Sequence, residues 1–357
     1  MRLGIIGLPV SGKTTIYNAL TGGNLPTGEM VAGRLEVHTA VSDVPDARVD
    51  ALSALFKPRK TIYAKVTYAD VGGLRAEAAR QGLPGQLLNQ LAQMDGFVHV
   101  VRAFDDPLAP HPAGSIDPAR DLVVLEAELL LNDMLTVERR LEKLGEERQK
   151  GGGRDRAVIE REQVLFGKLG EALGRNLPLR EMTLSPEDDK ALAVFGLLTR
   201  KPVLVVVNVA EGGGTSDLGT LGSGVQTLEL QGKIEMEIAQ LPPEEAMAFL
   251  AEYGIAEPGR SRVLRASYDL LGQQSFFTVG EDEVRAWTVR RGASAVEAAG
   301  VIHTDLARGF IRAEVIGCDE LLALGGLSQA KAVGKLRVEG REYVVSDGEI
   351  VHIRFNA

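Results

Sequence analysis

Apolar residues in much of the chain are gathered in short, nearly continuous runs that alternate with helix-like segments. Such runs lie at residues 3–6, 62–70, 97–104 and 201–210. A strand buried on both faces of a parallel sheet is apolar at most positions instead of at every second one. The alternation of these runs with helices therefore predicts a doubly wound α/β domain over residues 1–122 and 181–274.

A heptad repeat interrupts this pattern between residues 123 and 180. Seven apolar residues there are spaced alternately by four and three positions, and these are Val123, Ala127, Leu130, Met134, Val137, Leu141 and Leu144. Three glycines follow at 151–153, after which a similar spacing resumes. Because a heptad seam packs against a partner helix, we predict an antiparallel coiled-coil arm inserted into the α/β domain.

The C-terminal part, from about residue 275, has a different pattern. EVRAWTV (283–289) and FIRAEVI (310–316) are strand-like and flank a helical stretch. Glu339-Gly340 and Asp347-Gly348 are hairpin turn signals. These features predict a separate, small α+β domain over residues 275–357.

Composition narrows the class of protein without naming a function. The chain has 357 residues, enough for two or three domains, and a net charge of −9, which argues against non-specific coating of nucleic acid. Its one cysteine, Cys318, excludes a disulfide framework and a cysteine metal site. No apolar run reaches the ~20 residues that cross a bilayer, and the N-terminus lacks a signal-peptide pattern. We expect a cytoplasmic protein that does not enter membranes.

The segment GLPVSGKT (7–14) follows the first predicted strand and precedes a predicted helix. It matches the phosphate-loop pattern G-x-x-x-x-G-K-[ST] at every fixed position. Gly7 and Gly12 permit the tight turn, and the N–H groups of residues 10–14 would hold phosphates. Lys13 would contact the β- and γ-phosphates, and the Thr14 hydroxyl would bind Mg²⁺. The other residues of this predicted nucleotide site are Pro9, Val10, Ser11 and Thr15.

A second motif, DVGG (70–73), follows the strand-like run 62–70. Asp70 is placed to hold Mg²⁺ through water, and the N–H of Gly73 to donate to a γ-phosphate. Its position after the loop favours a switch NTPase over a small-molecule kinase. In Ras-like switches the next residue is a glutamine that orients the attacking water, whereas here it is Leu74, which cannot do so.

A third motif, NVAE, ends the apolar run 201–210. Ras-like GTPases carry N-K-x-D here, and the aspartate accepts two hydrogen bonds from guanine. In this chain Asn208 and Glu211 hold the two outer positions. Adenine offers one exocyclic donor beside a ring acceptor, so a carboxylate cannot bind it as it binds guanine. The motif thus indicates lost guanine preference more firmly than gained adenine preference, and Glu211 is equally compatible with an exposed loop carboxylate.

Together these residues resemble the YchF (Ola-type) branch of the Obg superfamily of P-loop NTPases. The resemblance is carried by GLPxxGK, DVPDARVDAL, DVGGL, HVVRAF and NVAE, and most specifically by residues 283–316. It implies hydrolysis of ATP in preference to GTP, with Mg²⁺, and association with ribosomes. It also implies that the coiled-coil arm is the family's insertion and that residues 275–357 form a β-grasp domain of the TGS type.

The resemblance also implies site residues. A histidine nine residues after the arginine of HVVR is a catalytic candidate in the family, and here that residue is His111. A loop histidine in a proline-rich segment is an equally compatible interpretation. The loop near the base reads LQGK (230–233), a departure from the S-A-K-like pattern that the family favours. At this position Gly232 and Lys233 are assigned to the nucleotide.

Two departures from the family pattern affect the predicted chemistry. Val10 stands where the family has an asparagine, and Arg34 stands where the first switch has a threonine. The segment after DVGG is altered as well. One hypothesis is slow ATP hydrolysis in which Arg34 supplies charge to the γ-phosphate, as an arginine finger does, alongside Lys13. The alternatives are a nucleotide-gated scaffold with little hydrolysis and an Obg-type GTPase.

The expected ligands are ATP or ADP, with GTP as an alternative, and the expected partner is the ribosome or its RNA. We expect no binding to DNA or to a membrane, and we expect the protein to act as a monomer. Candidate cations in the C-terminal domain are Arg285, Arg290, Arg291, Arg308 and Arg312. Arg148, Lys150, Arg154 and Arg156 lie near the tip of the predicted arm among acidic residues. The tip is compatible with a solvated helix surface or with a contact to an RNA-rich partner.

Overall fold

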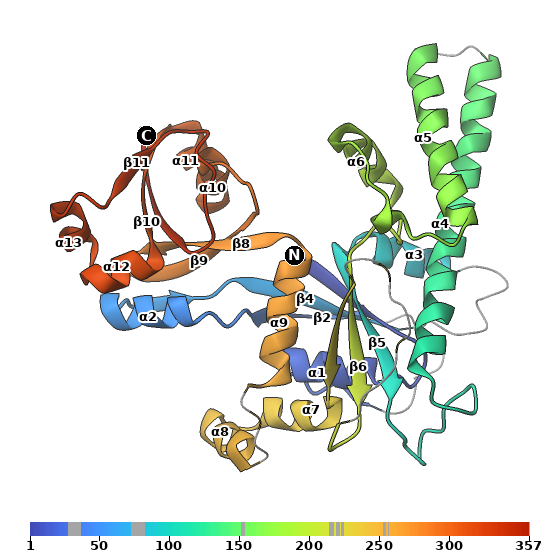
Figure 1. Ribbon diagram of the computed structural model, residues 1–357, viewed down its shortest axis with the longest axis horizontal. Coiled ribbons are helices and arrows are strands. Elements are labelled where there is room, and N and C mark those ends of the chain that lie inside the picture. The colour runs from blue at the N-terminus through green and yellow to red at the C-terminus, as the bar shows by residue number, and fades with distance from the viewer. Residues whose placement is uncertain are drawn as a thin grey trace. The chain divides into compact units, whose positions relative to one another are not determined.

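The computed structural model describes residues 1–27, 37–72, 83–150, 154–213, 218, 222, 225–252, 255 and 257–356. The chain forms two compact units, and each consists of segments that are distant in sequence (Figure 1). The first unit contains Met1–Ala40 and Thr67–Arg260, and the second contains Val41–Val66 and Ser261–Ala357.

A six-stranded sheet with the strand order β2-β4-β1-β5-β6-β7 forms the centre of the first unit. Its strands are β1 (Arg2–Ile6), β2 (Val37–Asp43), β4 (Lys65–Val71), β5 (Gly96–Ala103), β6 (Val203–Val209) and β7 (Gln226–Leu230). The pairs β1–β4, β1–β5, β5–β6 and β6–β7 are parallel. The carboxyl ends of these strands therefore meet at one edge, and the three predicted motifs all lie there.

Helices cover both faces of this sheet, as the apolar runs predicted. Helices of the first unit include α1 (Lys13–Thr21), α3 (Gly85–Ala92) and α7 (Gly232–Gln240), with α8 (Pro243–Glu252) packed against α7. The short helices η2 (Leu179–Glu181), α6 (Pro186–Leu192) and η3 (Ala193–Phe195) contribute to the apolar core of the arm, and α9 (Gly259–Leu270) lies almost entirely in the second unit. Every residue of β6 is buried. Helix α1 packs beside α7, and leucines of α3 and α4 join β5 and β6 in one apolar core.

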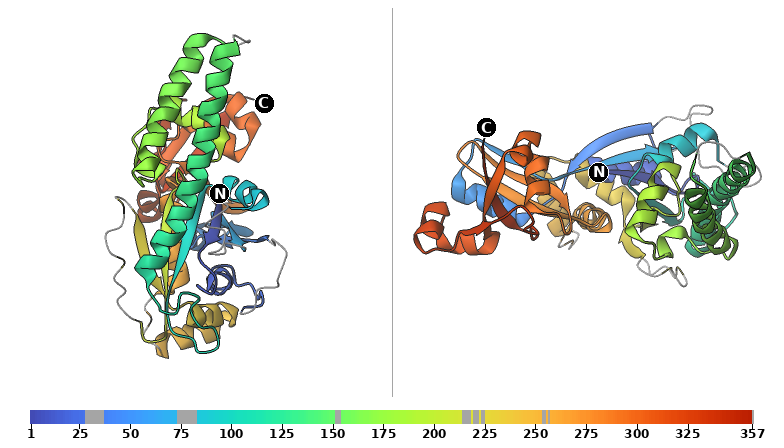
Figure 2. Two further views of the ribbon diagram at one scale, coloured as in Figure 1. Left: turned by 90° about the vertical axis from the view of Figure 1, so that its right-hand side faces the viewer. Right: turned by 90° about the horizontal axis from the view of Figure 1, so that it is seen from above.

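The arm consists of α4 (Pro118–Lys150) and α5 (Arg156–Gly174), which lie side by side in both views (Figure 2). Its apolar seam begins later than the heptad pattern predicted, because Val123 is 65% exposed while Val137 and Leu144 are buried. The first turns of α4 instead turn Leu125 and Leu129 toward the sheet. Helix α4 therefore packs against the sheet near its beginning and against α5 further along. The side of the helix that is buried changes between these two parts.

Buried polar contacts join α4 to the segment that precedes β6. The Asp133 carboxylate accepts hydrogen bonds from the N–H groups of Leu198 and Thr199, at 2.7 Å each, and from the Thr199 hydroxyl at 2.6 Å. Burial raises the pKa of Asp133, and these donors oppose that shift. Arg180 and Glu126 form an ion pair at 2.8 Å nearby. The base of the arm is thus held by hydrogen bonds in addition to its leucines.

The second unit contains a six-stranded sheet with the order β11-β10-β12-β8-β9-β3. Its elements are α2 (Ala47–Phe56), β3 (Lys60–Ile62), β8 (Gln273–Val279), β9 (Glu283–Arg290), α10 (Ala295–Ile302), α11 (Thr304–Arg308), β10 (Phe310–Gly317), α12 (Cys318–Leu324), α13 (Leu327–Ala332), β11 (Arg337–Glu339) and β12 (Glu349–Phe355). Strand β12 is parallel to β8 and antiparallel to β10, and α10 covers one face. A hairpin, a helix and a final central strand in this order form a β-grasp arrangement.

Residues 41–66 group differently from the boundaries inferred from the sequence, which assigned them to the α/β domain. Strand β3 pairs in parallel with β9, with Lys60 opposite Glu283 and Ile62 opposite Arg285. Helix α2 packs against β8 and β9. Such long-range strand pairing leaves no local pattern in the sequence, so the chain's passage into the second unit could not be read from it.

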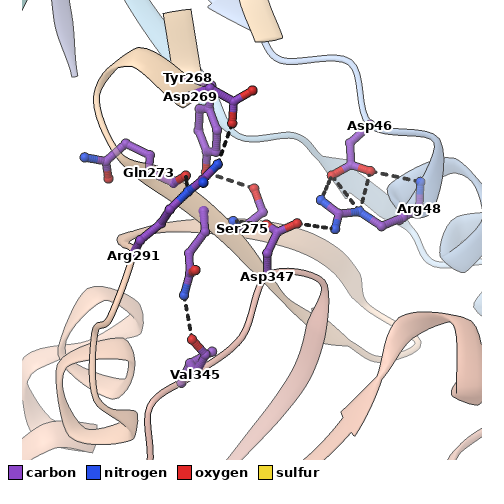
Figure 3. Close-up of polar contacts among 10 residues, drawn as sticks. Asp46, Arg48, Tyr268, Asp269, Gln273, Ser275, Arg291, Val345 and Asp347 are labelled. Atoms are coloured by element: carbon purple, nitrogen blue, oxygen red, sulfur yellow. Dashed lines mark hydrogen bonds and ion pairs between the residues drawn. The ribbon is translucent and has the colours of Figure 1, made fainter. Parts of the chain in front are cut away.

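Arg48 of α2 is the centre of a polar cluster in this unit (Figure 3). Its guanidinium donates to both oxygens of Asp46, at 2.9 and 2.8 Å, and to Asp347 at 2.7 Å. It also lies over the ring of Phe277, 5.1 Å from the centroid. Asp347 accepts a further bond from the N–H of Ser275 at 2.9 Å. The cluster ties residues 41–66 to strand β8 and to the turn before β12.

Replacing Arg48 with methionine should lower the free energy of unfolding of the second unit by about 2 kcal/mol, because both aspartates lose a charged donor. The matched control is Arg59→Met, since the Arg59 side chain is 83% exposed and its change should cost less than about 0.5 kcal/mol. Trp287, the chain's one tryptophan, lies in this unit and reports its urea unfolding by fluorescence. Equal midpoints for the two variants would contradict a structural role for the cluster.

Candidate nucleotide-binding site

The loop between β1 and α1 has the backbone that phosphate binding requires. Gly12 has a φ of 86°, and a Cβ there would overlap the side-chain amide of Asn208. A Cβ on Gly7 would overlap the carbonyl oxygen of Val100. Helix α1 begins at Lys13, and the first N–H groups of a helix have no acceptor within it. The loop therefore directs unpaired donors and the positive end of a helix dipole toward one point, which favours an anion.

Lys13 folds back over this loop. Its ammonium donates to the carbonyl oxygen of Leu8 at 2.9 Å, and the N–H of Ser11 approaches the same oxygen at 3.3 Å. Desolvation lowers the pKa of Lys13 to about 8, while the negative charge of Asp70 acts in the opposite direction. A polyphosphate beside the ammonium would favour its charged form and restore a higher pKa.

Thr14 and Asp70 form the metal-binding side of the site. The Thr14 hydroxyl donates to Oδ2 of Asp70 at 2.8 Å. Asp70 is the penultimate residue of strand β4, opposite Ile5 of β1, and its buried Oδ1 has no hydrogen-bond partner among the described residues. A hydroxyl beside a carboxylate with a spare oxygen suits Mg²⁺. The described residues contain no group of three or more His, Cys, Asp or Glu that could hold a metal ion by itself, so an ion here would also need phosphate and water oxygens.

Asn208 joins two loops at the edge of the sheet. Its amide Nδ2 donates to the carbonyl oxygen of Ser11, and its Oδ1 accepts from the N–H of Gly232, both at 3.1 Å. A Cβ on Gly232 would lie 2.6 Å from that Oδ1. Ser11, Asn208 and Gly232, which the sequence assigned to the nucleotide site, therefore lie together. The contacts of the Asn208 side chain are to the backbone, and they hold the phosphate loop in place.

The remaining predicted residues are placed less closely. Glu211 follows β6, and Lys233 is in the first turn of α7. Both side chains are exposed, and no contact between them is described. Pro9 and Thr15 lie in the loop and in the first turn of α1 and are partly buried. Three further residues of the sequence analysis, Arg34, Gly73 and Leu74, lie outside the described residues.

His111 makes hydrogen bonds through both of its ring nitrogens. Its Nε2 lies 2.7 Å from Oδ2 of Asp121, and its Nδ1 accepts from the N–H of Ala113 at 3.1 Å. The accepting Nδ1 requires the proton on Nε2, which then donates to Asp121. Both side chains are less than a tenth exposed. A catalytic role for His111 would require breaking both contacts, and it stays a prediction.

Arg102, the arginine of HVVR, contacts the phosphate loop. The sequence analysis used it only as the position from which His111 was counted. It is 1% exposed, and it donates to the carbonyl oxygens of Phe104, at 3.0 Å, and of Val10, at 3.2 Å. The signal was available, because an arginine in the apolar strand FVHVVRAF needs a polar partner. The partner itself lies 92 residues away and could not be identified from the strand.

The C-terminal arginines proposed for an RNA-rich partner do not all lie on one face of their sheet. Arg285 lies over the Trp287 ring at 3.8 Å, on the sheet face that α10 covers. In the register of β10 and β12, Arg312 lies opposite Arg354. Both are on the other face of the sheet, because the next residues, Ala313 and Ile353, enter the core. Other cations are paired with acids: Arg291 with Asp269, Arg308 with Asp305, Arg154 with Glu147 and Glu162, and Arg148 and Arg156 with Glu160.

Comparison with known proteins decides the family. The model YchF-GTPase_C, described as "Protein of unknown function (DUF933)", matches residues 273–356. The "Ribosome-binding ATPase YchF" of Bacillus subtilis (strain 168) is 40% identical, over 100% of this chain and 99% of the relative. The chain belongs to the YchF family. This confirms the resemblance drawn from the motifs.

Other YchF relatives extend across kingdoms. The Haemophilus influenzae "Ribosome-binding ATPase YchF" is 38% identical, with 99% of both chains covered. "Obg-like ATPase 1" of Oryza sativa subsp. japonica is 34% identical, over 100% of this chain and 92% of the relative. A solved structure, titled "Structure of the Schizosaccharomyces pombe YchF GTPase", has a TM-score of 0.82 and 28% identity, covering 99% and 97% of the two chains. The P-loop NTPase fold with its helical arm and C-terminal domain is thus confirmed.

The bracing role of Asn208 can be tested by Asn208→Ala. Removing the amide leaves the carbonyl of Ser11 and the N–H of Gly232 unpaired, so the free energy of unfolding should fall by about 2 kcal/mol. The control is Gln226→Ala on the neighbouring strand β7, where the side chain is exposed. Urea unfolding followed by circular dichroism measures both, and a change below ~0.5 kcal/mol for Asn208→Ala would contradict this role.

Proposed function

We propose that the chain binds ATP with Mg²⁺ in the 7–14 loop, hydrolyses it slowly, and associates with ribosomes. The Thr14–Asp70 contact beside the phosphate loop carries the proposal, because it joins a metal-binding pair to a polyphosphate cradle. The names of the relatives support both the ATPase activity and the ribosome as partner. None of the described helices is long and apolar enough to span a bilayer.

In this proposal the chain acts mainly by positioning charge. The loop amides and Lys13 hold the phosphates, while Thr14 and Asp70 hold the ion. Mg²⁺, when bound, neutralises negative charge that develops on the transferred phosphate. Asn208 keeps the loop in place through the carbonyl of Ser11. Leu74 cannot orient water, so another group must do so, and His111 is the candidate. Arg34 is the candidate for supplying positive charge to the γ-phosphate.

Preference for ATP over GTP belongs to the same proposal. Glu211 replaces the aspartate with which Ras-like proteins bind guanine, and it is exposed after β6. The relatives are named both as ATPases and, for the fission yeast protein, as a GTPase. Competition of ATP and GTP for a fluorescent ADP complex distinguishes an ATPase from an Obg-type GTPase.

A second candidate function is nucleotide-gated binding with little hydrolysis. It is favoured by the position of His111, whose ring nitrogens are both engaged. Single-turnover hydrolysis of ATP, with and without ribosomes, separates the two functions. An ATPase should convert bound ATP to ADP, whereas a scaffold should release it unchanged.

Three variants test the proposed site. Lys13→Ala should weaken ADP and ATP binding by about 10- to 100-fold, since it removes a charged donor.

Asp70→Asn should reduce the dependence of ATP binding on Mg²⁺ without abolishing ADP binding. Arg34→Ala should lower turnover and leave ADP affinity nearly unchanged. Titration calorimetry and single-turnover assays measure these effects, and unaltered binding by Lys13→Ala would refute the site.

The lowered pKa of Lys13 predicts how affinity changes with pH. Below pH 8 the ammonium is charged before and after ADP binds, so affinity should be constant. Above pH 8 the free protein loses this proton while bound phosphate favours it, so affinity should fall by up to about tenfold per pH unit. Lys13→Arg stays charged and should show a flat profile. A flat profile for the unmodified chain would contradict the shifted pKa.

A further inference from the structure

We propose that Arg102 is the positioning residue of the phosphate loop. It holds Val10 in a left-handed backbone conformation and so keeps the loop amides directed at the phosphates. This inference rests on the proposed nucleotide binding and adds to it a residue that acts through the loop. The neighbouring strand end supplies a second such tie through Asn208.

Val10 needs such support because its backbone conformation is unfavourable. Its φ is 56°, in the left-handed region. A β-branched residue is a rare outlier there, since its Cβ crowds the following carbonyl. Glycine and asparagine enter this region far more readily. Left to its own preference, Val10 would rotate out of it, and the peptide units on both sides would turn with it.

Arg102 opposes this rotation by holding the carbonyl that would move. Its Nη1 donates to the Val10 oxygen at 3.2 Å, while its Nε donates to the Phe104 oxygen at 3.0 Å. The guanidinium also stacks on the Phe104 ring, 4.5 Å from the centroid. The donor is therefore fixed on its own strand end, and Val10 can keep the bond only in the conformation observed.

Two adjacent strands act on consecutive peptide units of the loop. Arg102 of β5 lies opposite Asn208 of β6 in the parallel register, and Asn208 donates to the oxygen of Ser11. In a trans peptide the C=O and N–H groups point in opposite directions. Drawing the oxygens of Val10 and Ser11 toward the strand ends therefore turns two N–H groups toward the inside of the loop. The N–H of Ser11 there donates to the Leu8 oxygen, and the N–H of Gly12 is the one left for a phosphate.

Arg102 is poorly suited to a role in stability alone. It is almost fully buried, and its Nη2 has no hydrogen-bond partner among the described residues. Its charge is held by two carbonyls and a ring. A buried, incompletely paired donor is costly, and an apolar side chain of similar volume is often as stable in such a place. The geometry therefore points to the loop as the reason for an arginine here.

The test is a double-mutant cycle on ADP affinity with Arg102→Met and Val10→Gly. Arg102→Met alone should weaken ADP binding by about tenfold, because the loop amides lose their orientation. The affinity of Val10→Gly alone is measured as the reference for the double variant. In the double variant, affinity should return to within about threefold of Val10→Gly, because glycine adopts the left-handed conformation without help.

Arg102→Lys, which retains one donor, should bind ADP with intermediate affinity and keeps the test valid if Arg102→Met folds poorly. Thermal unfolding of each variant is measured in parallel. Equal weakening with Val10 and with Gly at this position would overturn the inference, as would unchanged affinity in Arg102→Met. Absence of ADP binding by the unmodified chain would instead overturn the proposed function, and this inference with it.

Discussion

The geometry of the phosphate loop depends on hydrogen bonds from two neighbouring strand ends to its backbone. Arg102 and Asn208 lie opposite each other on β5 and β6, and they donate to the carbonyls of Val10 and Ser11. A loop between a strand and a helix has few internal bonds, so its shape has to be imposed from outside. The parallel sheet supplies this constraint because the carboxyl ends of its strands meet at one edge.

The same edge explains why Lys13, Thr14 and Asp70 lie together. Thr14 is in the first turn of α1, while Asp70 is next to the last residue of β4, which pairs with β1 in parallel. Their hydrogen bond and the spare oxygen of Asp70 form a metal-binding pair next to the donors of the loop. Burial there lowers the pKa of Lys13. The charge of the lysine that would contact the phosphates therefore depends on the groups around it.

Between the phosphate loop and Asp70 the chain passes through the second unit. Residues 41–66 supply an edge strand and a helix to the C-terminal sheet, and Arg48 holds them there through Asp46 and Asp347. Strands β2 and β4 therefore begin or end in one unit and continue into the other. A segment that connects parts of the candidate site is thereby a structural part of the C-terminal unit.

The sequence by itself determined the elements whose signals are local. The glycines and lysine of GLPVSGKT, the apolar runs of β5 and β6, and the heptads of α4 and α5 each follow from the conformations those residues can adopt or bury. Only the tertiary structure decided which distant groups meet. Arg102 reaches Val10, Arg48 reaches Asp347, and Asn208 reaches Ser11. Such hydrogen-bond partners, far apart in the chain, are selected by packing, which leaves no periodic trace in the sequence.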